Sequence, residues 1–404
     1  MPALASTSLA IVRAIKETVF GVTPVAGNPT VLRIKSESLS FDITKASSAE
    51  INASRTISSV VPTTAKASGA LGIEMRAVGL EGFLESVMQS AFNAFGTLGL
   101  GVATATTGIS ATAITATAAT SGTSIFTALA QGQWFRVMSA GANNGKILRV
   151  STVTAPTASV LTLDLSTPAI VSAGESIQIQ AARLTHGTTQ SSWSIEKQLS
   201  DIGVFLNYTG MTPDKFNLKI ASGALSEASF DFIGKSALEA NVTALPGVPV
   251  AADGYDIHSG VSGATNAVWM DGAPLAGTFV KSVDLSFSNA LRSQEAIGTL
   301  GAVSVGAGTI QCSMSMQVYF ADKLTFTKFR TNAYTSFSFA STDSAGNGYV
   351  FTVPVGAIAT WKSAAGAKDQ DQMVDMTITA LNDINNPTLA LRKVLFIDRF
   401  GAVS

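Results

Sequence analysis

"SVDLSFSNALRSQEAIGTLGAVSVGAGTIQCSMSMQVYF", residues 282–320, predicts two β-strands joined by a long polar loop. The first strand alternates Val283, Leu285 and Phe287 with polar residues, and the second keeps the same rhythm from Ile310 to Phe320. Period-2 alternation of this length indicates a sheet with one apolar face and one polar, almost uncharged face. No catalytic group accompanies this polar face, so its purpose must lie elsewhere.

The composition is that of a neutral chain with few charges. Of 404 residues, 13% are charged and 46% are hydrophobic, whereas an average domain has about 25% charged residues. The hydrophobic content excludes a disordered protein, and the length predicts two or three domains. A net charge of −1 gives no basic field that would hold nucleic acid. Such a surface is either an ordinary neutral one or one covered by other subunits, and the polar strand faces favour the second.

Three further features narrow the class of protein. Cys312 is the only cysteine and falls on an apolar strand face, so we expect no disulfide framework. The first residues lack the basic and apolar regions of a secretory signal. The uncharged stretch between Glu85 and Arg136 is rich in Thr, Ser and Gly, so it predicts a strand or linker and no membrane span.

The fold class is mainly β with two helices. Period-2 alternation recurs in the segments "LGIEM" (71–75), "FNLKI" (216–220), "ASFDFI" (228–233), "TSFSF" (335–339), "GYVFTV" (348–353) and "VDMTITA" (374–380). The segment 78–92 has the apolar stripe of an amphipathic helix, and 321–331 predicts a weaker one.

Internal similarity predicts a duplication. "LSF" at 39–41 recurs at 285–287, and "GALGIEM" at 69–75 matches "GTIQCSM" at 308–314, a separation of about 240 residues. The pairs "SSWSI" and "TSFSF", "GVFLNY" and "GYVFTV", and "ASFDFIG" and "VDMTITA" are separated by about 145 residues. In each set the order of elements is the same. We therefore expect two copies of one fold.

The difference between the two separations indicates an insertion of about 95 residues in the first copy only. It must lie between the predicted helix near Phe92 and the strand near Ser191. There "GANNGK" (141–146) predicts a hairpin turn in a compact module of short strands. We divide the chain into 1–98, first part of repeat 1 with an N-terminal arm; 99–187, a small inserted β domain; 188–245, the rest of repeat 1; and 246–404, repeat 2 with a C-terminal arm.

The sequence predicts neither catalysis nor a metal or cofactor site. His186 and His258 lie in Gly/Ser/Thr-rich contexts without metal-ligand spacing. The Ser-x-x-Lys match at Ser194 falls in a strand, where an acyl-enzyme nucleophile is not expected. The cluster Asp369, Asp371 and Asp375 lacks the glycine and glutamate of a calcium loop.

The chain resembles the major tail tube proteins of long-tailed, siphovirus-like bacteriophages. The resemblance rests on "VRAIKETVFGVTP" (12–24), "ESLSFDITKASSAEINASR" (37–55), "SGALGIEMR" (68–76), "GLEGFLESVM" (79–88), residues 208–236, "SVDLSFSNALRSQEAIG" (282–298) and "GYVFTVP" (348–354). It covers nearly all of the chain outside about 99–187. It implies a tail-tube β-sandwich or barrel with flanking helices, whose strands join those of neighbouring subunits into a ring.

Under this resemblance the polar strand faces line a channel through which DNA slides. Lysine and arginine on such a wall would bind phosphates and stop passage. The candidate lumen-facing residues are Glu74, Arg76, Glu227, Ser229, Asp231, Gln311, Ser313, Ser315, Asp375, Thr377 and Thr379. Acidic and hydroxyl groups outnumber the one cation among them, which suits a surface that must not hold DNA.

The resemblance also implies partners and location. Duplicated chains would close a pseudo-six-fold ring with three subunits, whereas single-copy chains would need six. Rings would stack into a tube, contact the tape measure, terminator and distal tail proteins, and belong to the virion tail after assembly in the host cytoplasm. The N-terminal residues up to about 30 and the tail 386–404 are candidate stacking arms, and the insertion would decorate the outside.

Two other non-enzymatic functions stay open. One is a tail or baseplate component that forms a single ring. The other is a carbohydrate-binding β-protein. Its only support in the sequence is four scattered tryptophans, Trp134, Trp193, Trp269 and Trp361.

Overall fold

The computed structural model describes residues 6–93, 104–109, 112–116, 126–141, 143–164, 176–261, 268–275, 279–320, 323–364, 368–382 and 392–401. The fold is mainly β, as predicted. Both predicted helices are present but shorter, as α1 (Glu81–Val87) and α3 (Leu324–Thr331). Two short 3₁₀ helices, η1 (Thr7–Leu9) and η2 (Phe126–Ala128), complete the helical structure of the described residues.

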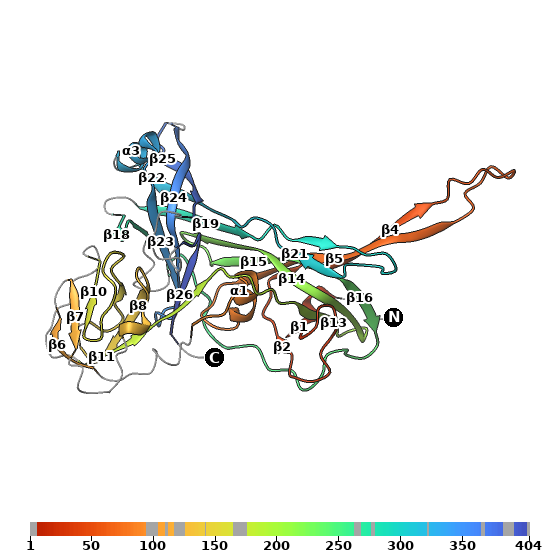
Figure 1. The fold of residues 1–404 in the computed structure, drawn as a ribbon, viewed down its shortest axis with the longest axis horizontal. Helices are drawn as coiled ribbons and strands as arrows, with labels where there is room; N and C mark the ends of the chain where they lie inside the picture. The colour runs from red at the N-terminus through yellow and green to blue at the C-terminus, as the bar shows by residue number, and fades with distance from the viewer. Residues whose placement is uncertain are drawn as a thin grey trace.

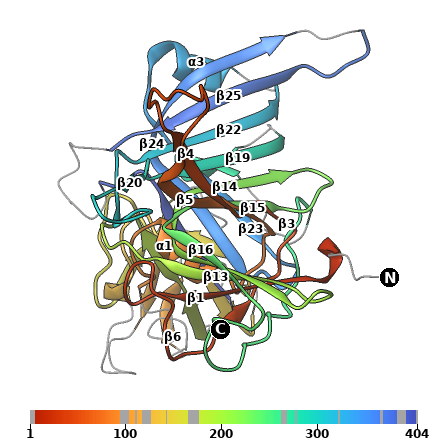
Figure 2. The same cartoon turned by 90° about the vertical axis from the view of Figure 1, so that its right-hand side faces the viewer.

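One antiparallel sheet runs through both halves of the chain, and we call it the spanning sheet. Its strands lie side by side in the order β4 (Ser40–Ser47), β5 (Val60–Glu74), β15 (Glu227–Gly234), β14 (Val204–Ala221), β19 (Val280–Ser288), β22 (Gln311–Tyr319), β25 (Met373–Ala380) and β24 (Gly348–Ala364). The short β3 (Ser36–Glu37) also pairs with β5. Over the described residues this sheet stays open and does not close into a barrel (Figure 2).

The long strands β14 and β24 leave the spanning sheet to join other strands. The first half of β14 lies between β13 (Trp193–Leu199) and β16 (Ser236–Ala240), and β13 continues to β1 (Ala10–Lys16) and β2 (Thr30–Val31). The first half of β24 lies between β23 (Thr335–Thr342) and β26 (Phe396–Phe400). Beyond these come β17 (Val268–Met270), β18 (Ala273–Pro274) and β12 (Ala182–Thr185). The strands β20 (Arg292–Gln294) and β21 (Ser304–Gly306) form a separate ribbon.

The strand order of the first half recurs in the second. The series β4–β5–β15–β14–β13 corresponds to β19–β22–β25–β24–β23, and a helix follows β5 and β22. The pairing registers correspond as well. Phe230 is paired with Leu71 and Phe216, and its counterpart Met376 is paired with Met316 and Trp361.

These registers correct one match that was made from the sequence. "GALGIEM" and "GTIQCSM" suggested that Leu71 corresponds to Ile310. The cross-strand pairs make Leu71 the counterpart of Met316, because both face the equivalent residue of the next strand. The shift is an even number of residues, so apolar side chains still fall on the same face of the sheet.

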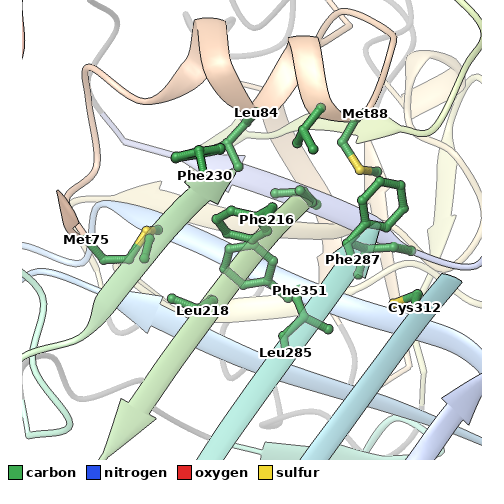
Figure 3. Packing of buried hydrophobic residues seen from close by; sticks show 14 of the residues in the cluster. Met75, Leu84, Met88, Phe216, Leu218, Phe230, Leu285, Phe287, Cys312 and Phe351 are labelled. Atoms are coloured by element: carbon green, nitrogen blue, oxygen red, sulfur yellow. The ribbon is translucent and has the colours of Figure 1, made fainter. Parts of the chain in front are cut away.

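A continuous apolar core fills the space between the spanning sheet and the elements that cover it. Figure 3 shows Phe216, Phe230, Phe287 and Phe351 packed together beneath α1. The rings of Phe216 and Phe351, from the two halves of the chain, are 6.0 Å apart between centroids. The two halves therefore share one core, and each buried phenylalanine contributes about 1.5–3 kcal/mol of hydrophobic stabilisation.

Residues of the predicted insertion form a separate six-stranded sheet. Its order is β10 (Val160–Thr162), β7 (Ala113–Ala116), β6 (Thr104–Ile109), β11 (Ser176–Gln180), β8 (Trp134–Ser139) and β9 (Ile147–Arg149), and it has its own apolar cluster. The next strand, β12, pairs with β26 in the large sheet. The change from one sheet to the other thus occurs near Ala182, before the boundary at 187 expected from the sequence.

Among the described residues, the expected arms are not the parts that project; residues 1–5, 386–391 and 402–404 of these arms lie outside the described residues. The N-terminal residues 10–16 form β1, and the tail contributes β26, whose residues are all buried. Instead the β4–β5 hairpin extends far from the body, opposite the six-stranded sheet (Figure 1). Its outer part is exposed and carries Ile43, Ile51, Ile57, Val60 and Val61.

Candidate functional site

The spanning sheet has one continuous polar side, which we call the polar face. On the opposite side the apolar residues of each strand are buried in the core, so alternation turns the intervening residues away from it. The polar face consists of Lys66, Ser68, Glu74, Glu227, Ser229, Asp231, Lys215, Asn217, Lys219, Ser282, Asp284, Ser286, Ser288, Gln311, Ser313, Ser315, Gln317, Asp375, Thr377, Thr379, Thr360 and Lys362.

Cross-strand pairing arranges these residues in rows across both halves of the chain. One row runs Glu74, Glu227, Lys219, Asp284, Ser315, Thr377 and Thr360. The next contains Ser229, Asn217, Ser286, Ser313 and Thr379. Side chains bond along the rows: Ser286 Oγ donates to Asn217 Oδ1 at 2.8 Å, and Asn217 Nδ2 donates to Ser229 Oγ at 3.2 Å.

Ten of the eleven candidates named from the sequence lie on this face, and Arg76 does not. Arg76 follows the end of β5 and is only 3% exposed, and its Nε donates to Asp253 Oδ2 at 2.6 Å. The alternation of β5 places Arg76 on the polar side, but the loop that carries Asp253 covers it. Arg76 therefore joins a buried ion pair and leaves the set of candidate lining residues.

The cations of the polar face are lysines that the sequence reading left out. Lys66, Lys215, Lys219 and Lys362 all lie on it and are exposed. The alternation of "FNLKI" was a sufficient signal for Lys219, because Phe216 and Leu218 alternate with it. These four lysines therefore add to the candidates named from the sequence, among which Arg76 is the one cation.

Each of these lysines has a carboxylate directly opposite on a neighbouring strand. Lys66 is paired with Asp42, Lys215 with Asp231, and Lys362 with Asp375; Lys219 lies between Glu227 and Asp284. Directly opposite residues have Cβ atoms about 4.5–5.5 Å apart, close enough for charge neutralisation. A further lysine outside the strands, Lys35, forms an ion pair with Glu227. Positive charge on this face is thus balanced locally, residue by residue.

The environment of Asp231 illustrates the balance. Burial raises the pKa of Asp231, Lys215 opposes this change and Asp214 adds to it. In the next rows Gln317 Nε2 donates to Asp375 Oδ1 at 2.9 Å. On this face Asp231 thus interacts electrostatically with Lys215, and Asp375 accepts a hydrogen bond within the sheet.

The family of the chain follows from comparison with known proteins. A family model described as phage tail tube protein matches residues 7–380, which includes every strand of the polar face. The chain belongs to the phage tail tube protein family. No curated protein matches the chain. As a tail tube protein it is a structural component of the virion tail, in a family that associates with copies of itself and with other tail proteins.

The histidines of this tail tube protein lie away from the polar face. His258 is buried, its Nδ1 is 2.9 Å from Ser341 Oγ, and burial lowers its pKa to about 4. Burial, assisted by Lys393, also lowers the pKa of His186 to about 4. Within the described ranges there is no group of three His, Cys, Asp or Glu residues that could hold a metal ion, and no helix long and apolar enough to cross a membrane.

The tryptophans of the tail tube protein serve packing. Trp134 and Trp269 are buried and pack against each other, with ring centroids 4.4 Å apart and planes tilted by 41°. Trp193 packs on Phe83 of α1, and Trp361 packs on Phe326 of α3. None of the four is fully exposed, so they do not form an open platform for a sugar ring.

Proposed function

We propose that this tail tube protein assembles into rings that stack into the hollow tail tube, and that the polar face lines the lumen through which DNA is ejected into the host. The observation that supports this most directly is the local charge balance of the polar face. Free lysines would bind phosphates and release counterions, and DNA binding strengthens with every such contact. Lysines that already face carboxylates offer DNA no such gain, so a sliding duplex meets a wall that neither holds nor repels it.

We also propose that the chain contains two copies of the tail tube fold and that three chains form a ring with pseudo-six-fold symmetry. The recurrence of strand order, pairing register and helix position in the two halves supports this proposal. Six chains per ring is the alternative, which the experiment below separates from it.

The β4–β5 hairpin is our candidate for the element that joins one ring to the next. An isolated two-stranded hairpin is only marginally stable in water. Because this long hairpin carries exposed isoleucines, we expect another subunit to bind and cover it. This hairpin favours a stacked tube over a component that forms a single ring. The six-stranded domain, at the opposite end of the molecule, would lie on the outside of the tube (Figure 1).

Electron microscopy of the purified protein at high concentration, with classification of end-on views, tests this proposal. Long hollow tubes with three-fold rings are the expected result. Six-fold tubes would keep the function and overturn the three-chain ring. Rings that never stack would favour a single-ring component of the tail, and monomers under all conditions would contradict self-assembly. In the virion the same tubes would meet the tape measure, terminator and distal tail proteins after assembly in the host cytoplasm.

A further inference from the structure

The spanning sheet ends at β24, whose second half has one unpaired edge. The equivalent strand of the first half of the chain, β14, is paired on both sides. The second half of β14 has β15 on one side and β19 on the other, and the pair β14–β19 joins the two halves of the chain. Its counterpart, the second half of β24, has β25 on one side. On the other side, over Thr360–Ala364, no strand pairs with it within the described part of the chain. An exposed edge of this kind is a template for strand addition.

The opposite end of the sheet is unpaired as well. β19 lies between β22 and β14, whereas its counterpart, the segment 36–42 with β3 and the start of β4, pairs only with β5. Among the described residues its other edge has no strand neighbour, and at Leu39 the N–H donates to Glu37 Oε2 and the carbonyl accepts from the Tyr208 hydroxyl instead. The two free edges are thus the counterparts of two strands that already fit together inside each chain.

We propose that the β24 edge of one chain pairs with the 39–42 segment of a second copy, in the register of the internal β14–β19 joint. In that joint Phe216 is paired with Phe287, Asn217 with Ser286 and Leu218 with Leu285. The corresponding pairs between chains are Trp361 with Phe41, Lys362 with Ser40, and Ser363 with Leu39. This inference rests on the proposed ring assembly and specifies the contact that closes the ring.

The side chains of this contact suit the two faces of the sheet. Trp361 is opposite the buried Met376, and Phe41 is opposite the buried Ala67, so both aromatic rings lie on the apolar side. Lys362 and Ser40 are exposed on the other side. The register would therefore place an aromatic pair over the core and extend the polar face without a break.

Exposure near the free edge shows what a second copy would cover. Met75 and Phe320 are counterparts, because the N–H of Met75 donates to Ser226 O and the N–H of Phe320 donates to Gln372 O. Met75 is 0% exposed, whereas Phe320 is 46% exposed and packs on Trp361, beside the half-exposed Phe326. Phe320, Phe326 and Trp361 therefore form an apolar patch beside the β24 edge that a second copy would cover in this register.

A disulfide between chains tests the register. The double variant S40C/K362C should form disulfides between chains under mild oxidation, because the internal counterparts Ser286 and Asn217 have side chains in hydrogen-bond contact. The native Cys312 is buried and adds no accessible thiol. As a positive control, N217C/S286C should cross-link within one chain. As a negative control, S40C/T377C places the second cysteine on β25, one strand in from the edge and opposite Thr360, two residues along from the position opposite Lys362.

The expected result is that most S40C/K362C chains migrate as covalent trimers in denaturing gels, with no larger species, while S40C/T377C stays monomeric. Covalent hexamers would support the joint and overturn the three-chain ring. Tubes that form without disulfides between chains would overturn the register and leave the tube function standing. Protein that stays monomeric at all concentrations, with or without oxidant, would overturn both.

Discussion

At the scale of single residues, the ion pair of Arg183 and Asp398 anchors the six-stranded domain. Both side chains are buried, and Arg183 Nε and Nη2 donate to the two oxygens of Asp398 at 2.7 Å. Asp398 also accepts the N–H of Trp134, and Arg183 donates to the carbonyls of Gln131 and Gly132. The pair therefore connects β12 and β26 to the first residues of β8.

Substitution of this pair should cost far more stability than substitution of an exposed one. D398N leaves a buried guanidinium without a counter-charge, so we expect a loss of about 3–5 kcal/mol in the free energy of unfolding. K35A removes the half-exposed pair with Glu227 and should cost less than about 1 kcal/mol. Urea denaturation of the two variants and the wild type measures both. Equal losses would contradict the role assigned to burial.

The buried His258 predicts a dependence of stability on pH. Burial lowers its folded pKa to about 4, whereas an unfolded histidine titrates near 6.5. As pH falls through this window the unfolded chain takes up a proton that the folded chain refuses, so stability present at pH 7 is lost by up to about 3 kcal/mol. Urea denaturation at intervals between pH 7 and pH 4 measures the loss. H258Q should lose less stability between pH 7 and pH 4. H186Q is the comparison variant, because the pKa of His186 is also lowered to about 4. An unchanged slope in H258Q would refute this attribution.

At the scale of elements, the sequence predicts strands well where one side faces a core. Alternation located β19, β22 and β25, because burial on one face imposes period 2. It could not assign the projecting element, because the outer part of the β4–β5 hairpin is exposed on both sides and lacks that constraint. It could not pair Lys219 with Glu227 and Asp284 either, since which residues lie opposite depends on register. Arg76 was misplaced because alternation predicts only the side of the sheet on which a residue lies. It does not show that the loop carrying Asp253 covers the Arg76 side chain.

Shortening the β4–β5 hairpin should separate ring formation from stacking. Replacement of 45–63 by Asn-Gly joins Thr44 and Thr64, which are already paired, through a two-residue turn. Almost all of the removed residues are exposed and none is buried, so the thermal unfolding temperature should change little, while single rings replace tubes in electron micrographs and sedimentation. In a full-length hairpin, I51S/I57S should weaken stacking without altering the length. Long tubes from the shortened variant would exclude the hairpin as the stacking element.

At the scale of the whole molecule, two devices fix how the parts lie together. The spanning sheet fuses both halves through β14 and β19, so the polar face is one surface. The six-stranded domain is held to the body by the contact between Trp134 and Trp269 and by Arg136, whose Nη2 donates to the carbonyl of Ala345 at 2.6 Å. A deletion of the whole predicted insertion, residues 99–187, would expose Trp269 and would also remove Arg183, the partner of Asp398. A deletion that ends at Gln180 retains β12 with Arg183 and is the sounder design.

The charge balance of the polar face should decide whether assembled tubes ignore DNA. E227Q/D284N removes both carboxylates beside Lys219 and leaves this lysine, with Lys35, free to bind phosphates. Tubes of this variant should bind short double-stranded DNA, and this binding should weaken steeply between about 50 mM and about 200 mM salt, whereas wild-type tubes should not bind. Co-sedimentation of labelled DNA with tubes measures it.

The matched control is E239Q/E295Q, which changes the net charge equally at exposed positions outside the polar face. These tubes should behave like the wild type. Adding K219Q to E227Q/D284N should reduce both the binding and its salt dependence, because one phosphate contact is then lost. Equal DNA binding by the control would show that net charge, and not the pairing of charges along the polar face, governs the interaction. That result would contradict the proposal that the polar face is the surface in contact with DNA.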